Sequence, residues 1–411
     1  MLISRGSIHH PIRSDVTALL ASIFSRRECD SVENIVNDRT TQHIKQFFDQ
    51  SLAVLYPFAR TGWYAVLMAL NLPPGSVILM TPFNIYPYLD IIHSFGYRVV
   101  FVDIEFDSFG PVLSDLKLKL AQSPGCFLLT YLFGYVPDID TITALCKNYN
   151  VPLIEDISQV IGAKYKSRLL GTFGSAAIYS ASLTKYIDSY NGGFVITSDG
   201  ALGKSLLGFA NTLAAPRSSR IQMIILKTLI WNICLNLYVF NVFTYPLLRL
   251  LKACLPRLFN SILGPSIKPA NSKHLPSFYF ESISNLQARS ISRYLHQLPI
   301  LIDQRTALAK KVQSIHKSYC TSWSAQGSDY TNVYWQYICP VANVDEARKV
   351  LFAIGVETGS TNLPLLSSLE GLTLDNADIL KSTQLFIPLH PSLSDDNYHR
   401  IFRELRIHNL I

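Results

Sequence analysis

The sequence lacks negative charge over a long internal stretch. From Ala201 to Phe280 it contains no aspartate or glutamate, although lysine and arginine recur throughout. The charge of the nine basic residues in this stretch exceeds the net charge of the whole chain, +7, so the remaining residues together are slightly acidic. The basic character therefore belongs to one segment and calls for a local explanation.

Signatures of several common cofactors and targeting signals are also missing. The seven cysteines are scattered without a CxxC pair or metal-ligand spacing, which fits a reducing compartment and predicts no metal site. No GxGxxG fingerprint and no GxxxxGK loop is present, so nicotinamide or nucleoside triphosphate use has little support. The first residues do not have the pattern of a secretory signal, and we expect a cytoplasmic protein.

What the sequence does contain is a regular alternation of apolar runs and amphipathic helical segments. Continuous runs of this kind predict a mostly parallel sheet covered by helices on both faces. The runs are VILMTP, RVVFVDI, CFLLTYL, PLIEDI, SAAIYSAS and GGFVITS, between residues 77 and 198. With 411 residues the chain is long enough for two domains.

We therefore expect four parts. Residues 1–50 form an N-terminal helical segment, and residues 51–212 form a large α/β domain. Residues 213–272 form an apolar, basic insert, and residues 273–411 form a smaller C-terminal α+β domain that resumes helical and strand-like patterns.

Two of the strand-like runs deliver polar residues to one edge of the predicted sheet, where α/β proteins bind ligands. Asp156 ends one run, and Lys185 follows the next. Taken singly, an aspartate there is most often a helix N-cap, and such a lysine is most often solvated. Together with Gln159 and Ser180 they indicate pyridoxal phosphate chemistry, which needs a lysine for the Schiff base and an acid for the ring nitrogen.

A second candidate lies at the start of a predicted helix. The turn Arg60-Thr61-Gly62 opens an apolar helical pattern, and the unpaired N–H groups of a helix N-terminus bind phosphate readily. An ordinary capped helix explains the same residues.

Several stretches, in this order, resemble the DegT/StrS-type aminotransferases, which are fold type I pyridoxal phosphate enzymes that aminate keto-sugars attached to nucleotides. They are FVDIE, YLFGYVPDID, VPLIEDISQVIGAKYKSRLLGTFG, YSASLTK, NGGFVITSD, SNLQARS and LFIPLHPSLSDD. The resemblance covers most of the chain from about Ala53, apart from residues 215–270. It implies a large domain with a mostly parallel central sheet between helices, and a smaller C-terminal α+β domain.

The resemblance also assigns roles. Lys185 matches the lysine that binds the cofactor and moves a proton on the substrate, and Asp156 matches the acid that keeps the pyridine nitrogen protonated. Gln159 matches a residue beside the ring, and Ser180 matches a phosphate ligand. The turn whose amides hold the phosphate is Arg60, Thr61 and Gly62.

The implied protein is a homodimeric transaminase. It would move an amino group from an amino acid, L-glutamate in the family pattern, to a nucleotide- or lipid-linked keto-sugar in cell-surface glycan or secondary-metabolite biosynthesis.

The chain also departs from the family pattern. Phe280-Glu281-Ser282-Ile283 stands where the family has Asn-Tyr-Arg-Met, so the Asn that reaches the partner subunit's cofactor is missing. Asn191 replaces an acid before Gly-Gly, and only Thr361 and Asn362 stand in the stretch that lines the sugar site. Two alternatives therefore remain open: another fold type I reaction such as a lyase or dehydratase, or a non-catalytic protein that binds cofactor or a partner at a membrane.

The insert contains 21 consecutive uncharged residues between Lys227 and Arg249, which is long enough to cross a bilayer. Several polar or helix-breaking residues interrupt it: Asn232, Asn236, Asn241 and Pro246. A single span would also separate residues 278–411 from Lys185, although both belong to one site. We therefore expect an in-plane helix, a re-entrant hairpin that bends near Tyr245-Pro246, or a dimer interface.

Composition favours the membrane among these options. A leucine-rich segment with basic and no acidic residues suits the inner face of the cytoplasmic membrane, where anionic lipids attract lysine and arginine. We expect the contact to involve residues 215–265. Nucleic acid is not an expected partner, because the basic residues are sparse and the aromatic residues lie in apolar runs.

Overall fold

The computed structural model describes residues 2–4, 8–32, 38–258, 275–320, 330–359, 363–391 and 393–411. Thr361, Asn362 and the end of the insert, residues 259–272, lie outside the described residues. The N-terminal segment contains the helices α1 (Ile12–Phe24), α2 (Arg26–Cys29) and α3 (Arg39–Phe48), in agreement with the helical pattern expected there.

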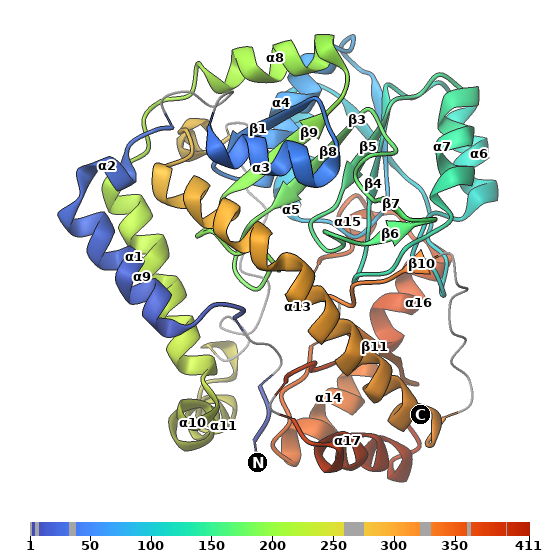
Figure 1. Cartoon of the computed structure of the whole chain (residues 1–411). Helices are drawn as coiled ribbons and strands as arrows, with labels where there is room; N and C mark the ends of the chain where they lie inside the picture. Colours follow the sequence, from blue (N-terminus) through green and yellow to red (C-terminus); the bar gives the residue numbers. More distant parts are fainter. Residues whose placement is uncertain are drawn as a thin grey trace.

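A seven-stranded sheet forms the centre of the large domain (Figure 1). Its order is β1 (Leu52–Tyr56), β9 (Gly193–Thr197), β8 (Ala176–Ser180), β5 (Leu153–Asp156), β4 (Cys126–Thr130), β2 (Val77–Met80) and β3 (Arg98–Phe101). The strands from β8 to β3 are parallel, while β9 runs antiparallel to both β1 and β8. The expected mostly parallel sheet is confirmed, and the apolar runs form strands that are largely buried, apart from the partly exposed edge strand β3.

Helices connect and cover these strands. They are α4 (Ala59–Leu70), α5 (Tyr86–Ser94), α6 (Leu113–Leu120), α7 (Ile139–Asn148) and α8 (Gly200–Ala210). Between β8 and β9 the chain has no helix and instead passes through residues 181–192 before it returns antiparallel. This connection carries Lys185. A small three-stranded sheet of β6 (Lys164–Tyr165), β7 (Arg168–Leu169) and β10 (Tyr330–Thr331) lies beside the main one.

One long helix, α13 (Asn285–Lys317), joins the large domain to the small one (Figure 1). Its first half packs into the core of the large domain through Ile291 and Leu298, and its second half packs into a separate core through Val312. That second core holds the two-stranded sheet of β11 (Tyr337–Pro340) and β12 (Gln384–Ile387) with α14 (Val344–Ala353) and α17 (Asp395–Ile407). Two shorter helices, α15 (Leu366–Leu369) and α16 (Asp375–Thr383), complete the described part of the α+β domain.

The insert forms a bent helical pair on the outside of the molecule (Figure 1). Helix α9 (Ser218–Leu235) packs along α1, and the chain continues through α10 (Leu237–Val239), a π-helical turn η1 (Phe240–Thr244) and α11 (Tyr245–Cys254). A short 3-10 turn, η2 (Ser277–Phe280), precedes α13. Among the described helices, none is by itself both long and apolar enough to cross a membrane, and one pair that bends by 65° meets that requirement only when its two arms are taken together.

The bend lies at Asn236, so the expectation of a bend near Tyr245-Pro246 is wrong. Asn236 leaves helical geometry with φ −58° and ψ 134°, and its side chain accepts a hydrogen bond from the Tyr238 N–H, which starts a new helix. At Pro246 the chain does not bend in this way, because the backbone stays helical from the π-helical turn η1 into α11, with φ −67° and ψ −49° at Thr244.

Candidate active site

The carboxyl end of β5 brings Asp156 to the edge of the sheet beside β8. Asp156 is the last residue of β5 and is paired with Ile178 of β8. Its Oδ1 accepts a hydrogen bond from the Ser158 N–H at 3.0 Å, and the Tyr88 hydroxyl from α5 donates to the same carboxylate. Burial raises the pKa of Asp156, while these hydrogen bonds and the charge of Lys185 oppose that rise. A carboxylate is thereby held in a buried site at the strand end.

Lys185 lies in the connection between β8 and β9 and is electrostatically coupled to Asp156. Burial lowers the pKa of Lys185 to about 8, although the charge of Asp156 acts in the opposite direction. The Lys185 ammonium lies 4.3 Å from the Trp335 ring centroid, and the Trp335 indole N–H donates to the Thr184 carbonyl at 3.1 Å. Lys185 is therefore positioned by an aromatic ring and is close to losing its proton at neutral pH.

The residues around this pair form a connected polar group. The Ser180 N–H donates to the Ser158 hydroxyl at 3.0 Å, and the Ser180 hydroxyl donates to that of Ser182 at 3.2 Å. Gln159 is buried, and its Oε1 accepts the Phe133 N–H at 2.6 Å. The structure thus brings Asp156, Ser180 and Lys185 to one edge of the sheet, with Gln159 three residues beyond β5.

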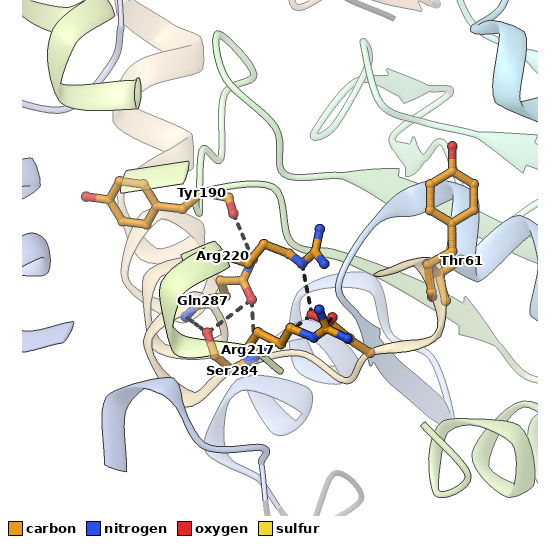
Figure 2. Close-up of polar contacts among 8 residues, drawn as sticks. Thr61, Tyr190, Arg217, Arg220, Ser284 and Gln287 are labelled. Carbon is orange, nitrogen blue, oxygen red and sulfur yellow. Dashed lines mark hydrogen bonds and ion pairs between the residues drawn. The ribbon is translucent and has the colours of Figure 1, made fainter. Parts of the chain in front are cut away.

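In the turn at the start of α4, the backbone N–H groups that were expected to hold a phosphate donate to a carbonyl of the protein. The N–H groups of Thr61 and Gly62 donate to the Phe58 carbonyl, and the Thr61 hydroxyl donates to the Tyr279 carbonyl at 2.8 Å (Figure 2). Gly62 is needed for packing, because a Cβ there would lie 2.7 Å from a methyl group of Val195. The assignment of these amides to a phosphate stays a prediction.

Arg60, which was expected to contribute a backbone amide, also offers its side chain. Its guanidinium carbon lies 4.1 Å from the Phe58 ring centroid and 4.7 Å from that of Tyr279. Its Nε is buried without a hydrogen-bond partner among the described residues, and burial lowers the pKa of Arg60. A cation enclosed by aromatic rings beside a helix N-terminus suits an anion such as a phosphate group.

Three aromatic or histidine side chains near Lys185 were also not predicted from the sequence. Tyr88 and Trp335 have the contacts described above, and the His9 ring stacks on Tyr186 with 5.6 Å between centroids. Burial and the charge of Arg305 lower the pKa of His9 to about 3, so it is neutral. The only sequence signal was position, since Tyr88 follows a strand-like run, and neither Trp335 nor His9 stands in a recognisable motif.

The segment from Tyr279 to Gln287 ties the site to the insert (Figure 2). Tyr279 binds α4 as described, and Glu281 forms ion pairs with Arg217 at 3.5 Å and Arg220 at 3.1 Å. Ser284 and Gln287 form a capping box at the start of α13, and the Gln287 side-chain amide donates to the Tyr190 carbonyl at 2.7 Å. Glu281, one of the departures from the family pattern, therefore anchors the start of α9.

These residues fit pyridoxal phosphate. A buried carboxylate suits a protonated ring nitrogen, a lysine with a lowered pKa suits covalent attachment of the aldehyde, and a buried arginine with an unpartnered donor suits a phosphate.

Comparison with known proteins points the same way. The model of the DegT/DnrJ/EryC1/StrS aminotransferase family matches residues 37–221. A pleiotropic regulatory protein of Geobacillus stearothermophilus is 31% identical over 142 residues, which cover 34% of this chain and 38% of that protein. GDP-perosamine synthase of Escherichia coli O157:H7 is 28% identical over 146 residues, which cover 36% of this chain and 40% of that enzyme. The matched region spans about two fifths of the length of these curated relatives.

The similarity of fold extends over the whole chain. A solved DegT DnrJ EryC1 StrS aminotransferase from Brucella abortus aligns with a TM-score of 0.70 and 16% identity, over 97% of this chain and 96% of that one. At this level of identity the match shows the fold. The expected architecture of a pyridoxal phosphate transferase, with a large α/β domain and a smaller α+β domain, is confirmed.

Proposed function

Because residues 37–221 match the model of the DegT/DnrJ/EryC1/StrS aminotransferase family, and the chain has the fold of a solved member, we propose that it is a pyridoxal-phosphate-dependent aminotransferase. The observation that carries the proposal is the coupling of Lys185, with its lowered pKa, to the buried carboxylate of Asp156. We propose L-glutamate as the amino donor, a keto-sugar as the acceptor and a homodimer as the active form.

Bound pyridoxal phosphate supplies an aldehyde that takes up the amino group and a protonated ring that withdraws electrons. Lys185 Nζ, with a pKa of about 8, is about one tenth unprotonated at pH 7, so it can act as a nucleophile and as a base for one proton. The Asp156 carboxylate would hold the proton on the ring nitrogen, and the hydrogen bonds from Ser158 and Tyr88 keep that carboxylate oriented. Trp335 restricts access of water to Lys185 from one side.

The acceptor proposal is supported by the relatives. One of them is named for GDP-perosamine, a nucleotide-linked sugar, and a nucleotide-linked keto-sugar is therefore the first acceptor to test. A lipid-linked keto-sugar is the second, and it is favoured by the apolar outer surface of the insert.

The absorption spectrum of the purified protein with pyridoxal phosphate, recorded before and after addition of L-glutamate, tests the proposal. In the wild type we expect a visible band that L-glutamate removes, and borohydride reduction should add the cofactor's mass to the peptide that contains Lys185. Lys185→Met should lose both. A wild-type protein without the mass increase and without a response to L-glutamate would contradict the proposal.

Product analysis separates the reaction types. Incubation with L-glutamate and nucleotide-linked keto-sugars should give an amino sugar and 2-oxoglutarate, which mass spectrometry detects. Release of water or a small fragment without amino transfer would instead favour a lyase or dehydratase.

A further inference from the structure

Large apolar side chains gather on the outward side of α1 and of the bent pair formed by α9 to α11. Most of the exposed large apolar side chains among the described residues belong to these helices. We call this surface the apolar ridge, and its exposed members include Leu20, Phe24, Met223, Ile230, Tyr238 and Phe243, which are 50–83% exposed. Helix α1 lies along α9, so the two helices present one continuous surface (Figure 1).

The buried polar residues of α1 and α9 face the interface between these helices and the protein. The Asn232 side chain is buried, and its amide donates to Asp15 Oδ2 at 2.7 Å and to the His10 carbonyl at 3.1 Å. Asp15 is fully buried under α9 and also accepts hydrogen bonds from His10 and Tyr190. A helix on a water-facing surface has the reverse arrangement, with its polar face outward. The ridge therefore has the polarity expected of a surface in contact with an apolar phase.

Like Asn232, Asn241 bonds to the rest of the protein. It bonds with the backbone of Leu2 through both its side-chain oxygen and its amide, at 2.8 Å and 3.3 Å. Two of the three asparagines that weaken the insert as a transmembrane span, Asn232 and Asn241, thus hold it to the protein.

The charges around the apolar ridge are positive. Arg13, Lys227 and Arg249 are exposed on its three helices. Two acidic residues nearby are engaged, since Asp15 is buried and Glu281 is paired with Arg217 and Arg220. Anionic lipid headgroups complement this pattern.

Both arms of the bent pair remain attached to the protein. The start of α9 is bound by the ion pair between Arg220 and Glu281. On the other arm, the Tyr245 hydroxyl donates to the Phe352 carbonyl, and the Lys252 ammonium lies 4.3 Å from the Phe352 ring centroid. The pair therefore lies along the molecule, and the 18 residues of α9 extend the apolar ridge over about 27 Å.

From this geometry we infer that the apolar ridge of α1, α9 and α11 docks the protein in the plane of an anionic bilayer, which we assign to the inner leaflet of the cytoplasmic membrane. The helices insert their outer side chains into the headgroup region without spanning it. A second copy of the chain is a poorer occupant, because a twofold contact places the same surface on both sides and so brings like charges together. The inference concerns location and does not depend on amino transfer.

Flotation of the full chain with lipid vesicles tests this inference. We expect binding to vesicles that contain phosphatidylglycerol and weaker binding to vesicles of phosphatidylcholine alone. A variant with Leu20→Ser, Met223→Ser, Ile230→Ser and Phe243→Ser should bind at least about a hundredfold more weakly, because each exchange removes apolar surface that enters the lipid.

A matched variant controls for general loss of surface hydrophobicity. Leu118→Ser, Ile300→Ser, Ile379→Ser and Ile407→Ser also replace exposed apolar residues, with 48–70% exposure, but away from the apolar ridge. This variant should bind vesicles like the wild type. Equal binding of the two variants would overturn the inference.

The charges are tested separately. Arg13→Gln, Lys227→Gln and Arg249→Gln together should weaken binding to anionic vesicles by about a hundredfold and leave binding to neutral vesicles little changed, since each cation contributes about fivefold near an anionic surface. An unchanged affinity for anionic vesicles would overturn the assignment of the lipid class.

Two further measurements test how deeply the helices insert into the bilayer and whether a second copy of the chain covers the apolar ridge instead. Tryptophan placed by Phe243→Trp should be quenched most by lipids brominated near the headgroups, and strongest quenching at the bilayer centre would contradict in-plane docking. Light scattering without lipid should give the same oligomeric state for the wild type and the ridge variant. A change from dimer to monomer without any vesicle binding would assign the apolar ridge to a second copy.

Discussion

Glu155 and Asp156 are adjacent carboxylates with different functions because successive side chains of a strand point to opposite faces. Glu155 accepts hydrogen bonds from the Tyr131 hydroxyl and from the N–H groups of Gly171, Phe173 and Gly174, at 2.7–2.8 Å. It therefore holds the turn before β8 in place. Asp156 points to the other side, toward Tyr88 and Lys185.

This difference predicts different results for two conservative exchanges. Glu155→Gln should lower the free energy of unfolding by about 2–4 kcal/mol, because an amide N–H replaces an acceptor among backbone donors. Asp156→Asn should cost less stability but alter the visible spectrum of bound pyridoxal phosphate. Urea unfolding and absorption measurements on both variants check this, and equal losses of stability would speak against the assignment.

Lys185→Met should stabilise the cofactor-free protein at neutral pH. The folded protein holds Lys185 at a pKa of about 8 against an ordinary value of 10.5, so below pH 8 the fold bears the cost of a buried ammonium. Removing that charge should raise the free energy of unfolding by about 2–3 kcal/mol at pH 7.

The gain should shrink as pH rises. Between pH 8 and 10.5 the unfolded chain retains the proton that the folded chain has released, so wild-type stability increases with pH and approaches that of the variant. Urea titrations at several pH values measure the difference. A gain that is constant across this range would contradict the lowered pKa.

Arg60→Gln should weaken binding of pyridoxal phosphate about 10- to 100-fold, because a charge-assisted contact to the phosphate is lost. Binding of pyridoxal, which lacks the phosphate, should change little, so comparison of the two ligands by fluorescence titration is the measurement. Equal weakening for both would mean that Arg60 supports the fold of the site and not the phosphate.

At the scale of elements, Glu281 joins the insert to the rest of the protein. Its side chain is only 10% exposed and faces two arginines of the insert. Glu281→Gln should speed hydrogen exchange at residues 217–225 and lower the free energy of unfolding by about 1–3 kcal/mol. Glu346→Gln, which removes an exposed pair with Lys349, should cost less than about 1 kcal/mol. Unchanged hydrogen exchange at the start of α9 in the Glu281→Gln variant would contradict this prediction.

The bend of the insert lies at a residue that the sequence alone did not identify. Pro246 suggested a break because proline interrupts helices, yet the chain stays helical from the π-helical turn η1 into α11. Asn236 ends α9 through its backbone angles and its side-chain cap, which the sequence reveals only if the end of the preceding helix is already known.

For the whole molecule, the sheet could be predicted because its strands are continuous apolar runs and its crossovers are amphipathic helices. The positions of Asp156 and Lys185 could be predicted because one ends such a run and the other follows the next. The contacts of Arg60, Trp335 and Glu281 could not, since each joins residues distant in sequence by means of side-chain packing. The same applies to Asp15 and Asn232, which are separated by 217 positions.

The pairing of α1 with α9 also has a consequence for the order of synthesis. Helix α1 leaves the ribosome early, but α9 follows about 200 residues later, which takes roughly 10–40 s at typical rates of translation. During that interval Asp15 has no Asn232 to bind, while every strand of the central sheet has already been made by residue 197. The surface of α1 and α9 is therefore completed only after β5, which ends at Asp156, and the connection that contains Lys185 are available to fold.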